Sequence, residues 1–185
     1  MKEHPILFSD EMVRALLAKR KTVTRRLSRS WLKVKAGDLL WVRETHLTYR
    51  TRVYTNEGMF LDPPRAIYAA DGGTLVNGSK YKPSIHMPRW ASRITLRATE
   101  DARLERLQDI TEDEAIAEGC EASEVFTETD ADGLTGQERE LALMFAGGRF
   151  TAKLGYMELW DSLNAKKAPW NSNPEVVRIA FSVQL

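Results

Sequence analysis

The chain has 185 residues, 43% of them hydrophobic and 29% charged, with a formal net charge of +1, as in an ordinary globular protein. No apolar run approaches the ~18 residues that cross a membrane, and the N-terminus lacks the apolar core of a signal peptide. The single cysteine, Cys120, excludes an internal disulfide. We therefore expect one cytoplasmic domain over residues 1–185, without membrane contact.

The first half of the chain alternates between predicted strands and one helix. A short strand, HPILFS, precedes a helix that Ser9 or Asp10 caps and that carries an apolar stripe. The β-branched residues of KTVTRRL favour a strand, with Thr22, Thr24 and Arg26 on one face and Lys21 and Arg25 on the other. A bulge in this strand would bring Lys21 and Thr24 together. Further strands follow at LLWVRE, RAIYAAD and ASRITLRATEDARLERL.

The second half adds helices and a last strand. Thr111 and Glu114 have the spacing of a capping box, and Gly119 ends the helix that they open. LTGQERELALMFAGG and FTAKLGYMELWDSLNAK are predicted helices, and PEVVRIAFSVQL is a strand that closes the chain. Strands with helices between and around them predict an α+β domain, in the form of a small barrel.

The charge is unevenly distributed along the chain. Residues 1–35 hold ten lysines and arginines against three acidic residues, whereas residues 118–140 hold eight acidic residues against one arginine. This asymmetry favours one face toward a polyanion and an opposite, solvated acidic face. The alternative is that both segments form ordinary solvated surface.

Several known site patterns are absent. The sequence contains no P-loop, no G-x-G-x-x-G and no G-x-S-x-G. His4, His46 and His86 are scattered and there is one cysteine, so we expect neither a metal site nor a cofactor. His46, close to Glu44, is either a base or a hydrogen-bonded structural residue.

The tryptophans divide into two kinds. Trp41 alternates with aliphatic residues, and Trp160 and Trp170 lie in a helix and a turn, so all three are expected in the core. Trp90, in HMPRWASR, instead lies among cations that grip phosphate while the ring stacks on a base, or it pins a loop to the barrel. Glu44 pairs either with a cation of a binding cleft or in a structural salt bridge.

Two stretches near the N-terminus carry a family resemblance. ILFSDEMVRALLAKRKTVTRR, followed by GDLLWVRET, resembles the start of an ASCH domain, of the PUA-like superfamily. YAADG, KPSIHMPRWASRITL, LQDITEDEAIAEG, LWDSLNAK and WNSNPEVV resemble a longer branch found in phages and prophages. The resemblance implies a PUA-like β pseudo-barrel with surrounding helices, a cleft for RNA or a nucleotide-like ligand, and a helical insertion around residues 120–150.

The same resemblance implies a catalytic site. Small bacterial members that are similar in this region hydrolyse N4-acetylcytidine with a lysine, a threonine and a glutamate, which correspond here to Lys21, Thr24 and Glu118. Lys19 replaces the glycine of their G-R-K-T-x-T-x-R pattern, and ITEDEAIAEG carries the glutamate. A threonine hydroxyl needs a base to become a nucleophile, and burial beside cations lowers the pKa of a lysine toward that role.

The sequence is compatible with three functions. The leading hypothesis is an RNA- or nucleotide-binding module that uses a basic cleft; the alternatives are an amidohydrolase on acylated nucleosides and a metal-independent ribonuclease. In all three the partner is RNA, a nucleoside or a nucleotide. The residues expected to bind it are Arg20, Arg25, Arg26, Glu44, His86, Arg89, Trp90 and Arg93.

Overall fold

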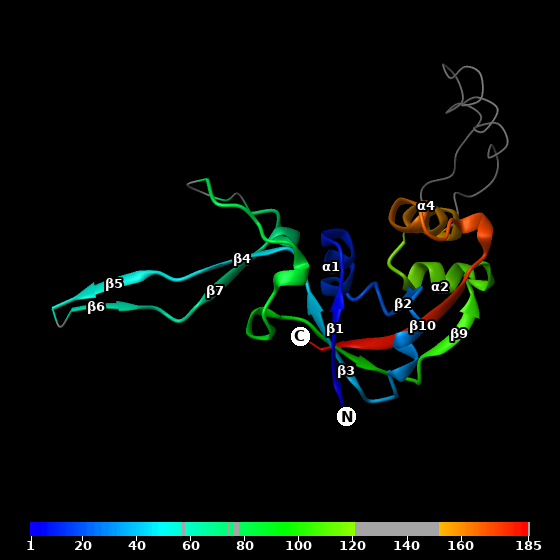
Figure 1. Ribbon diagram of the computed structural model, residues 1–185, viewed down its shortest axis with the longest axis horizontal. Helices are drawn as coiled ribbons and strands as arrows, with labels where there is room; N and C mark the ends of the chain where they lie inside the picture. Colours follow the sequence, from blue (N-terminus) through cyan, green and yellow to red (C-terminus); the bar gives the residue numbers. More distant parts are fainter. Residues whose placement is uncertain (57, 74, 76–77, 121–151, 185) are drawn as a thin grey trace, which may run out of the picture. The chain divides into compact units, whose positions relative to one another are not determined.

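The computed structural model describes residues 1–184 except 57, 74, 76–77 and 121–151 (Figure 1). The described chain forms two compact units. The first comprises residues 1–19, 34–101 and 180–185, and the second comprises 20–33 and 102–179. The expected insertion around 120–150 and the helix predicted at LTGQERELALMFAGG lie outside the described residues, and the expectation of a single domain stays a prediction.

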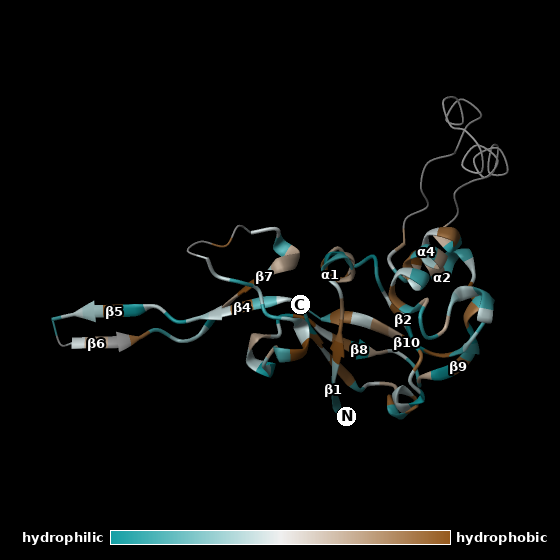
Figure 2. Cartoon of the chain, turned by 45° about the horizontal axis from the view of Figure 1, so that its top comes forward, coloured by the Kyte–Doolittle hydropathy of each residue, from teal (hydrophilic) through white to brown (hydrophobic). Residues whose placement is uncertain are grey.

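The first unit is built on three strands and the end of a fourth. β1 (Glu3–Leu7) pairs in parallel with β3 (Leu39–Arg43), and β8 (Thr95–Ala98) pairs antiparallel with β3 and with the end of β10 (Glu175–Gln184). Figure 2 shows the hydrophobic colour along β1, whose Ile6 is buried. Helix α1 (Asp10–Leu17) begins at Ser9, whose hydroxyl accepts from the Met12 amide, so the predicted cap is confirmed.

A long hairpin extends from this unit (Figure 1). β4 (His46–Tyr49) pairs with β7 (Arg65–Tyr68), and β5 (Arg52–Thr55) pairs with β6 (Gly58–Leu61), both antiparallel. The strand at β7 was predicted from the sequence, whereas β4, β5 and β6 were not. Three short 3₁₀ turns follow the hairpin: η2 (Ala69–Asp71), η3 (Ser84–His86) and η4 (Arg89–Ala91).

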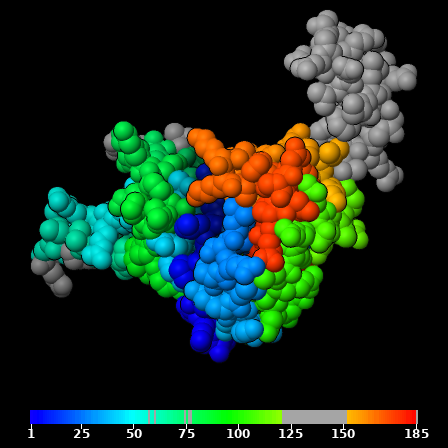
Figure 3. Space-filling model, turned by 45° about the vertical axis from the view of Figure 1, so that its right-hand side comes forward, coloured from blue at the N-terminus to red at the C-terminus, as the bar shows by residue number. Residues whose placement is uncertain are grey.

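The second unit packs two helices on short strands. It holds β2 (Val23–Arg26), β9 (Arg103–Arg106), the first part of β10, α2 (Glu112–Ala117) and α4 (Ala152–Asn164). β9 pairs antiparallel with β10, and Figure 3 shows β10 in red bordered by the blue 20–33 segment and the green β9 region. The Thr111 hydroxyl accepts from the Glu114 amide at 3.3 Å, which confirms the predicted cap of α2.

Aromatic residues fill the core of the second unit. Trp160 donates its indole N–H to the carbonyl of Ala168 at 2.8 Å, and the ring of Tyr156 contacts those of Trp160 and Trp170. The expectation that Trp160 and Trp170 are core residues is confirmed. The unit also contains η1 (Arg29–Lys33), η5 (Leu107–Asp109) and η7 (Trp170–Ser172).

Strand β3 corrects one expectation. Leu40 and Val42 are buried, whereas Trp41 remains partly exposed and is covered by the guanidinium groups of Arg43 and Arg89, 5.3 and 5.7 Å from its ring centroid. The strict alternation of a strand places Trp41 on the face opposite Leu40 and Val42. Trp41 is therefore not a core residue.

The strand order along the hydrogen-bonded sheet is β1-β3-β8-β10-β2, with β9 beside β10. This curled, half-barrel sheet with a few helices is a mixed α/β architecture, compatible with the predicted α+β class. In the described part of the chain, no helix has the length and hydropathy to cross a membrane.

Candidate functional site

The centre of the candidate site is a buried ion pair in the second unit. Lys21 Nζ lies 2.5 Å from Glu118 Oε2 and donates to the Glu118 carbonyl at 2.7 Å. The side chains of Lys21 and Glu118 are 0% and 3% exposed. Lys21 and Glu118 are 97 positions apart in the chain and are in direct contact. The family resemblance had named both as catalytic residues without knowledge of this contact.

The local structure explains this contact. Glu118 caps the C-terminus of α2, and the amide of Thr22 donates to the carbonyl of Ala117 at 2.8 Å, which holds the end of α2 against the entry to β2. A helix C-terminus is rich in free carbonyl groups and favours a cation. Lys21, which directly precedes Thr22, supplies that cation.

Arg25 joins the same carboxylate and two others. Its guanidinium donates to Glu105 at 2.6 Å, to Glu114 at 2.6 Å and to Glu118 at 3.2 Å, and it lies 5.9 Å from the ring centroid of Tyr156. Arg25 is 3% exposed. The guanidinium of Arg25, which was expected to bind the ligand, thus donates to three carboxylates of the chain itself.

The carboxylates around Arg25 have further cationic partners. Arg178 donates to Glu114 at 2.9 Å, and Arg103 lies 3.8 Å from Glu105. This network was not predicted, although the sequence carries a signal of it: Glu114 and Glu118 are four residues apart, a spacing that places two side chains on one helix face.

Burial shifts the pKa values of several groups in this cluster. The pKa of Lys21 lies below its ordinary value because burial outweighs the attraction of Glu118, and Arg26 lowers it further. Burial also raises the pKa of Tyr156 well above its ordinary value, and that of Cys120 to about 11. Lys21 is therefore easier to deprotonate than a solvated lysine, whereas Cys120 resists ionisation.

The other residues of the basic stretch lie in different environments. Thr24 is buried on β2 between Val23 and Arg25, which are also buried, so both faces of this strand are covered. In the described part of the chain, no hydrogen bond joins Thr24 to Lys21 or Glu118.

Arg20 is exposed and donates to the carbonyl of Gly119 at 3.5 Å. Arg26 is half-buried, and burial lowers its pKa despite the attraction of Glu118.

A second charged group lies in the first unit. Glu44, 0% exposed, accepts two hydrogen bonds from Arg93, at 3.0 and 2.9 Å, and Arg93 also donates to Asp71. The Arg93 guanidinium lies 3.9 Å from the ring centroid of Tyr68. Glu44 therefore pairs with Arg93, which is itself one of the arginines expected to bind the ligand.

His46 is a structural histidine. It is 1% exposed, its Nδ1 lies 3.1 Å from the carbonyl of Glu44, and its backbone pairs with that of Lys82. Burial lowers its pKa. The structure thus supports the hydrogen-bonded alternative over a base.

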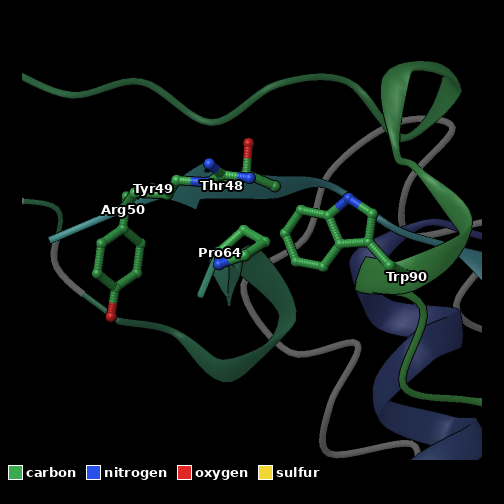
Figure 4. A pocket seen from close by; sticks show the side chains of 5 residues that line it. All are labelled: Thr48, Tyr49, Arg50, Pro64 and Trp90. Carbon is green, nitrogen blue, oxygen red and sulfur yellow. The ribbon is translucent and has the colours of Figure 1, made fainter. Parts of the chain in front are cut away.

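Trp90 lies at the surface of the first unit. It is 51% exposed and lines a cavity of about 270 Å³ together with Thr48, Tyr49, Arg50 and Pro64 (Figure 4). We call this cavity the Trp90 pocket. Its hairpin residues were missed, although YRTRVY, with tyrosines and arginines interleaved, signals them.

The two other candidates near Trp90 are also exposed. Arg89 lies 3.1 Å from Glu3, and His86 ends η3. Among the residues that the structure describes, no group of three or more histidine, cysteine, aspartate or glutamate side chains is placed to hold a metal ion.

No family model, no curated protein and no solved structure matches this chain. The geometry of the two units, together with the sequence patterns, therefore carries the functional proposal.

Proposed function

We propose that the protein is an amidohydrolase that removes an acyl group from the exocyclic nitrogen of a nucleobase, as in N4-acetylcytidine. The single observation that carries the proposal is the buried contact between Lys21 Nζ and Glu118 Oε2 at 2.5 Å. Residues whose pKa is shifted by burial and by a specific charged partner are found especially often in catalytic sites, and Lys21 is such a residue.

In this proposal the three residues divide the chemistry. Neutral Lys21 takes the proton of the Thr24 hydroxyl, whose oxygen attacks the acyl carbon. The C–N bond then breaks, and the Lys21 ammonium returns the proton to the departing amine. Glu118 takes a proton from the water that hydrolyses the Thr24 ester and returns it to the departing Thr24 oxygen, so the products are the free base and the carboxylic acid and the three residues are restored. The lowered pKa of Lys21 increases the fraction of neutral amine available near neutral pH.

The fold that goes with this proposal is a PUA-like pseudo-barrel in an ASCH domain. The curled sheet, the helix α1 after the first strand and the position of Lys21 just before β2 support it. The family pattern places its lysine and threonine at the start of a strand near the N-terminus, where Lys21 and Thr24 lie here.

The test follows the release of cytidine from N4-acetylcytidine by chromatography. Lys21→Met and Thr24→Val remove the amine and the hydroxyl, and we expect each to reduce turnover by ~10²–10⁴-fold. Thr24→Ser keeps part of the activity because serine retains the nucleophilic oxygen. Lys153→Met is the matched control: Lys153 also donates to a carbonyl, that of Gln108, but is not in the Glu118 pair. Turnover that survives the loss of both Lys21 and Thr24 refutes the assignment.

RNA or nucleotide binding without cleavage is the second candidate. The half-exposed Trp90 favours it, as do the exposed Lys80 and Lys82 earlier in the same segment, whereas Arg89 and Arg93 pair with carboxylates. A ribonuclease is the third candidate, and it has to bring a polymer, rather than a single nucleoside, to the fully buried Lys21. Chromatography of labelled RNA incubated with the protein separates the three: fragments indicate a nuclease, and intact RNA bound without deacylation indicates a binding protein.

A further inference from the structure

The Trp90 pocket is held in shape by the strands and turns around it. Thr48 and Tyr49 belong to β4, Arg50 follows directly, and Pro64 precedes β7. The antiparallel register of β4 and β7 sets Tyr49 opposite Arg65. The pocket wall on this side is therefore fixed by backbone pairing.

Trp90 itself is fixed from the other side. The hydroxyl of Tyr68, on β7, donates to the carbonyl of Ala91 at 2.8 Å, which ties η4 to the hairpin. Arg93 covers the Tyr68 ring and is itself held by Glu44 and Asp71. In Figure 4 the indole of Trp90 faces Pro64, with Thr48 beside them. The indole is thus held in place while half of its surface stays open to solvent.

The size and charge of the Trp90 pocket indicate which class of ligand it can bind. Its volume of about 270 Å³ is below the ~300–1,000 Å³ of sites for drug-sized molecules and accommodates one flat ring system. Its lining contains one cation, Arg50, and no carboxylate. Arg50 and Arg52 are exposed, and neither has an ion pair among the described residues. The Trp90 ring can stack on a planar group, and the nearby Arg50 and Arg52 can bind negative charges. This combination favours a ligand that has both planar rings and several negative charges.

We infer that the Trp90 pocket binds one base of a single-stranded nucleic acid, with the base on the indole of Trp90 and the adjacent phosphate on Arg50. This inference rests on the second candidate function, nucleic-acid binding, and is independent of hydrolysis at Lys21. A single strand is required because the bases of a duplex are stacked on one another and cannot lie on a protein ring. A proline-rich peptide, which also docks on aromatic grooves, is the competing ligand.

The experiment measures the binding of a fluorescein-labelled ten-nucleotide single-stranded RNA to the full chain by anisotropy over a salt series. We expect Trp90→Ala to weaken binding by about 5- to 150-fold, the range for loss of one stacked base, with Trp90→Phe in between. Arg50→Ala should weaken binding and lower the magnitude of the salt slope by ~1. Arg97→Ala is the matched control, since Arg97 is an exposed arginine of the same unit that does not line the pocket. The RNA duplex should bind more weakly than the single strand.

The outcomes separate the pocket from the broader function. RNA binding that is unchanged in Trp90→Ala and Arg50→Ala overturns the pocket while nucleic-acid binding stands. Absence of RNA binding to the unmodified chain at low salt overturns both. A proline-rich peptide that binds with dependence on Trp90, where RNA does not, also overturns the inference. The melting temperature of each variant shows that it is folded, and Arg50→Ala, an exposed substitution, tests the site if Trp90→Ala loses stability.

Discussion

The Lys21–Glu118 pair predicts a large energetic coupling that a double-mutant cycle measures. The cycle consists of Lys21→Met, Glu118→Gln and the double variant. Glu118→Gln leaves the buried Lys21 amine without its carboxylate, and the loss of one partner of a buried pair costs ~3–5 kcal/mol. Lys21→Met costs less, roughly 1–3 kcal/mol, because Glu118 keeps the hydrogen bond from Arg25 at 3.2 Å. The double variant leaves no unpaired lysine, so its cost should be smaller than the sum by at least ~2 kcal/mol.

The free energy of unfolding is measured by urea titration, followed by tryptophan fluorescence, at pH 7. Lys35→Met is the control: Lys35 pairs with Asp101 at 3.0 Å, but both side chains are exposed, so its loss should cost under ~1 kcal/mol. Costs of Lys21→Met and Glu118→Gln that add to within ~0.5 kcal/mol in the double variant refute the coupling.

The free energy of unfolding of the same variants, measured as a function of pH, tests the lowered pKa of Lys21. Because the pKa of Lys21 is lowered in the folded state, the unfolded chain binds more protons at this residue between the folded pKa and ~10.4. The contribution of Lys21 to stability therefore rises with pH in that window, by at most ~1.4 kcal/mol per pH unit, and is constant below the folded pKa. The stability difference between the unmodified chain and Lys21→Met should rise accordingly. A difference that falls with pH in this window contradicts the lowered pKa.

Three further predictions concern the rest of the chain. Glu44→Gln should destabilise the protein by ~1–3 kcal/mol in urea titration, because Arg93 keeps only Asp71 as a charged partner, and an unchanged midpoint contradicts the buried pair. Cys120, with its pKa raised to about 11, should react with iodoacetamide at pH 7.5 at least ~10-fold more slowly in the folded chain than in urea, and equal rates contradict its burial. Trp160→Ala should cost ~3–5 kcal/mol, whereas Leu163→Ala on the exposed face of the same helix should cost under ~1 kcal/mol; similar costs contradict the core.

The local features of this protein could be predicted from the sequence. The Ser9 and Thr111 caps and the helices that they begin follow from rules that act within a few residues. Three of the four hairpin strands were not predicted, because strands such as HLTY and RVYT are short and only partly buried, and the period-2 pattern is weak in them.

In the candidate site, too, the sequence indicates the residue types, whereas the tertiary structure decides which of them are in contact. The residue types at Lys21 and Glu118 are visible in the sequence, but their contact depends on how the end of α2 packs against the entry to β2, 97 positions away. Arg25 and Arg50 are both arginines in basic stretches, and only the tertiary structure distinguishes them. Arg25 is buried among three carboxylates, whereas Arg50 is exposed beside Trp90. A cap or a strand period depends on neighbouring residues, whereas the role of a charge depends on which opposite charges the fold places within a few ångströms of it.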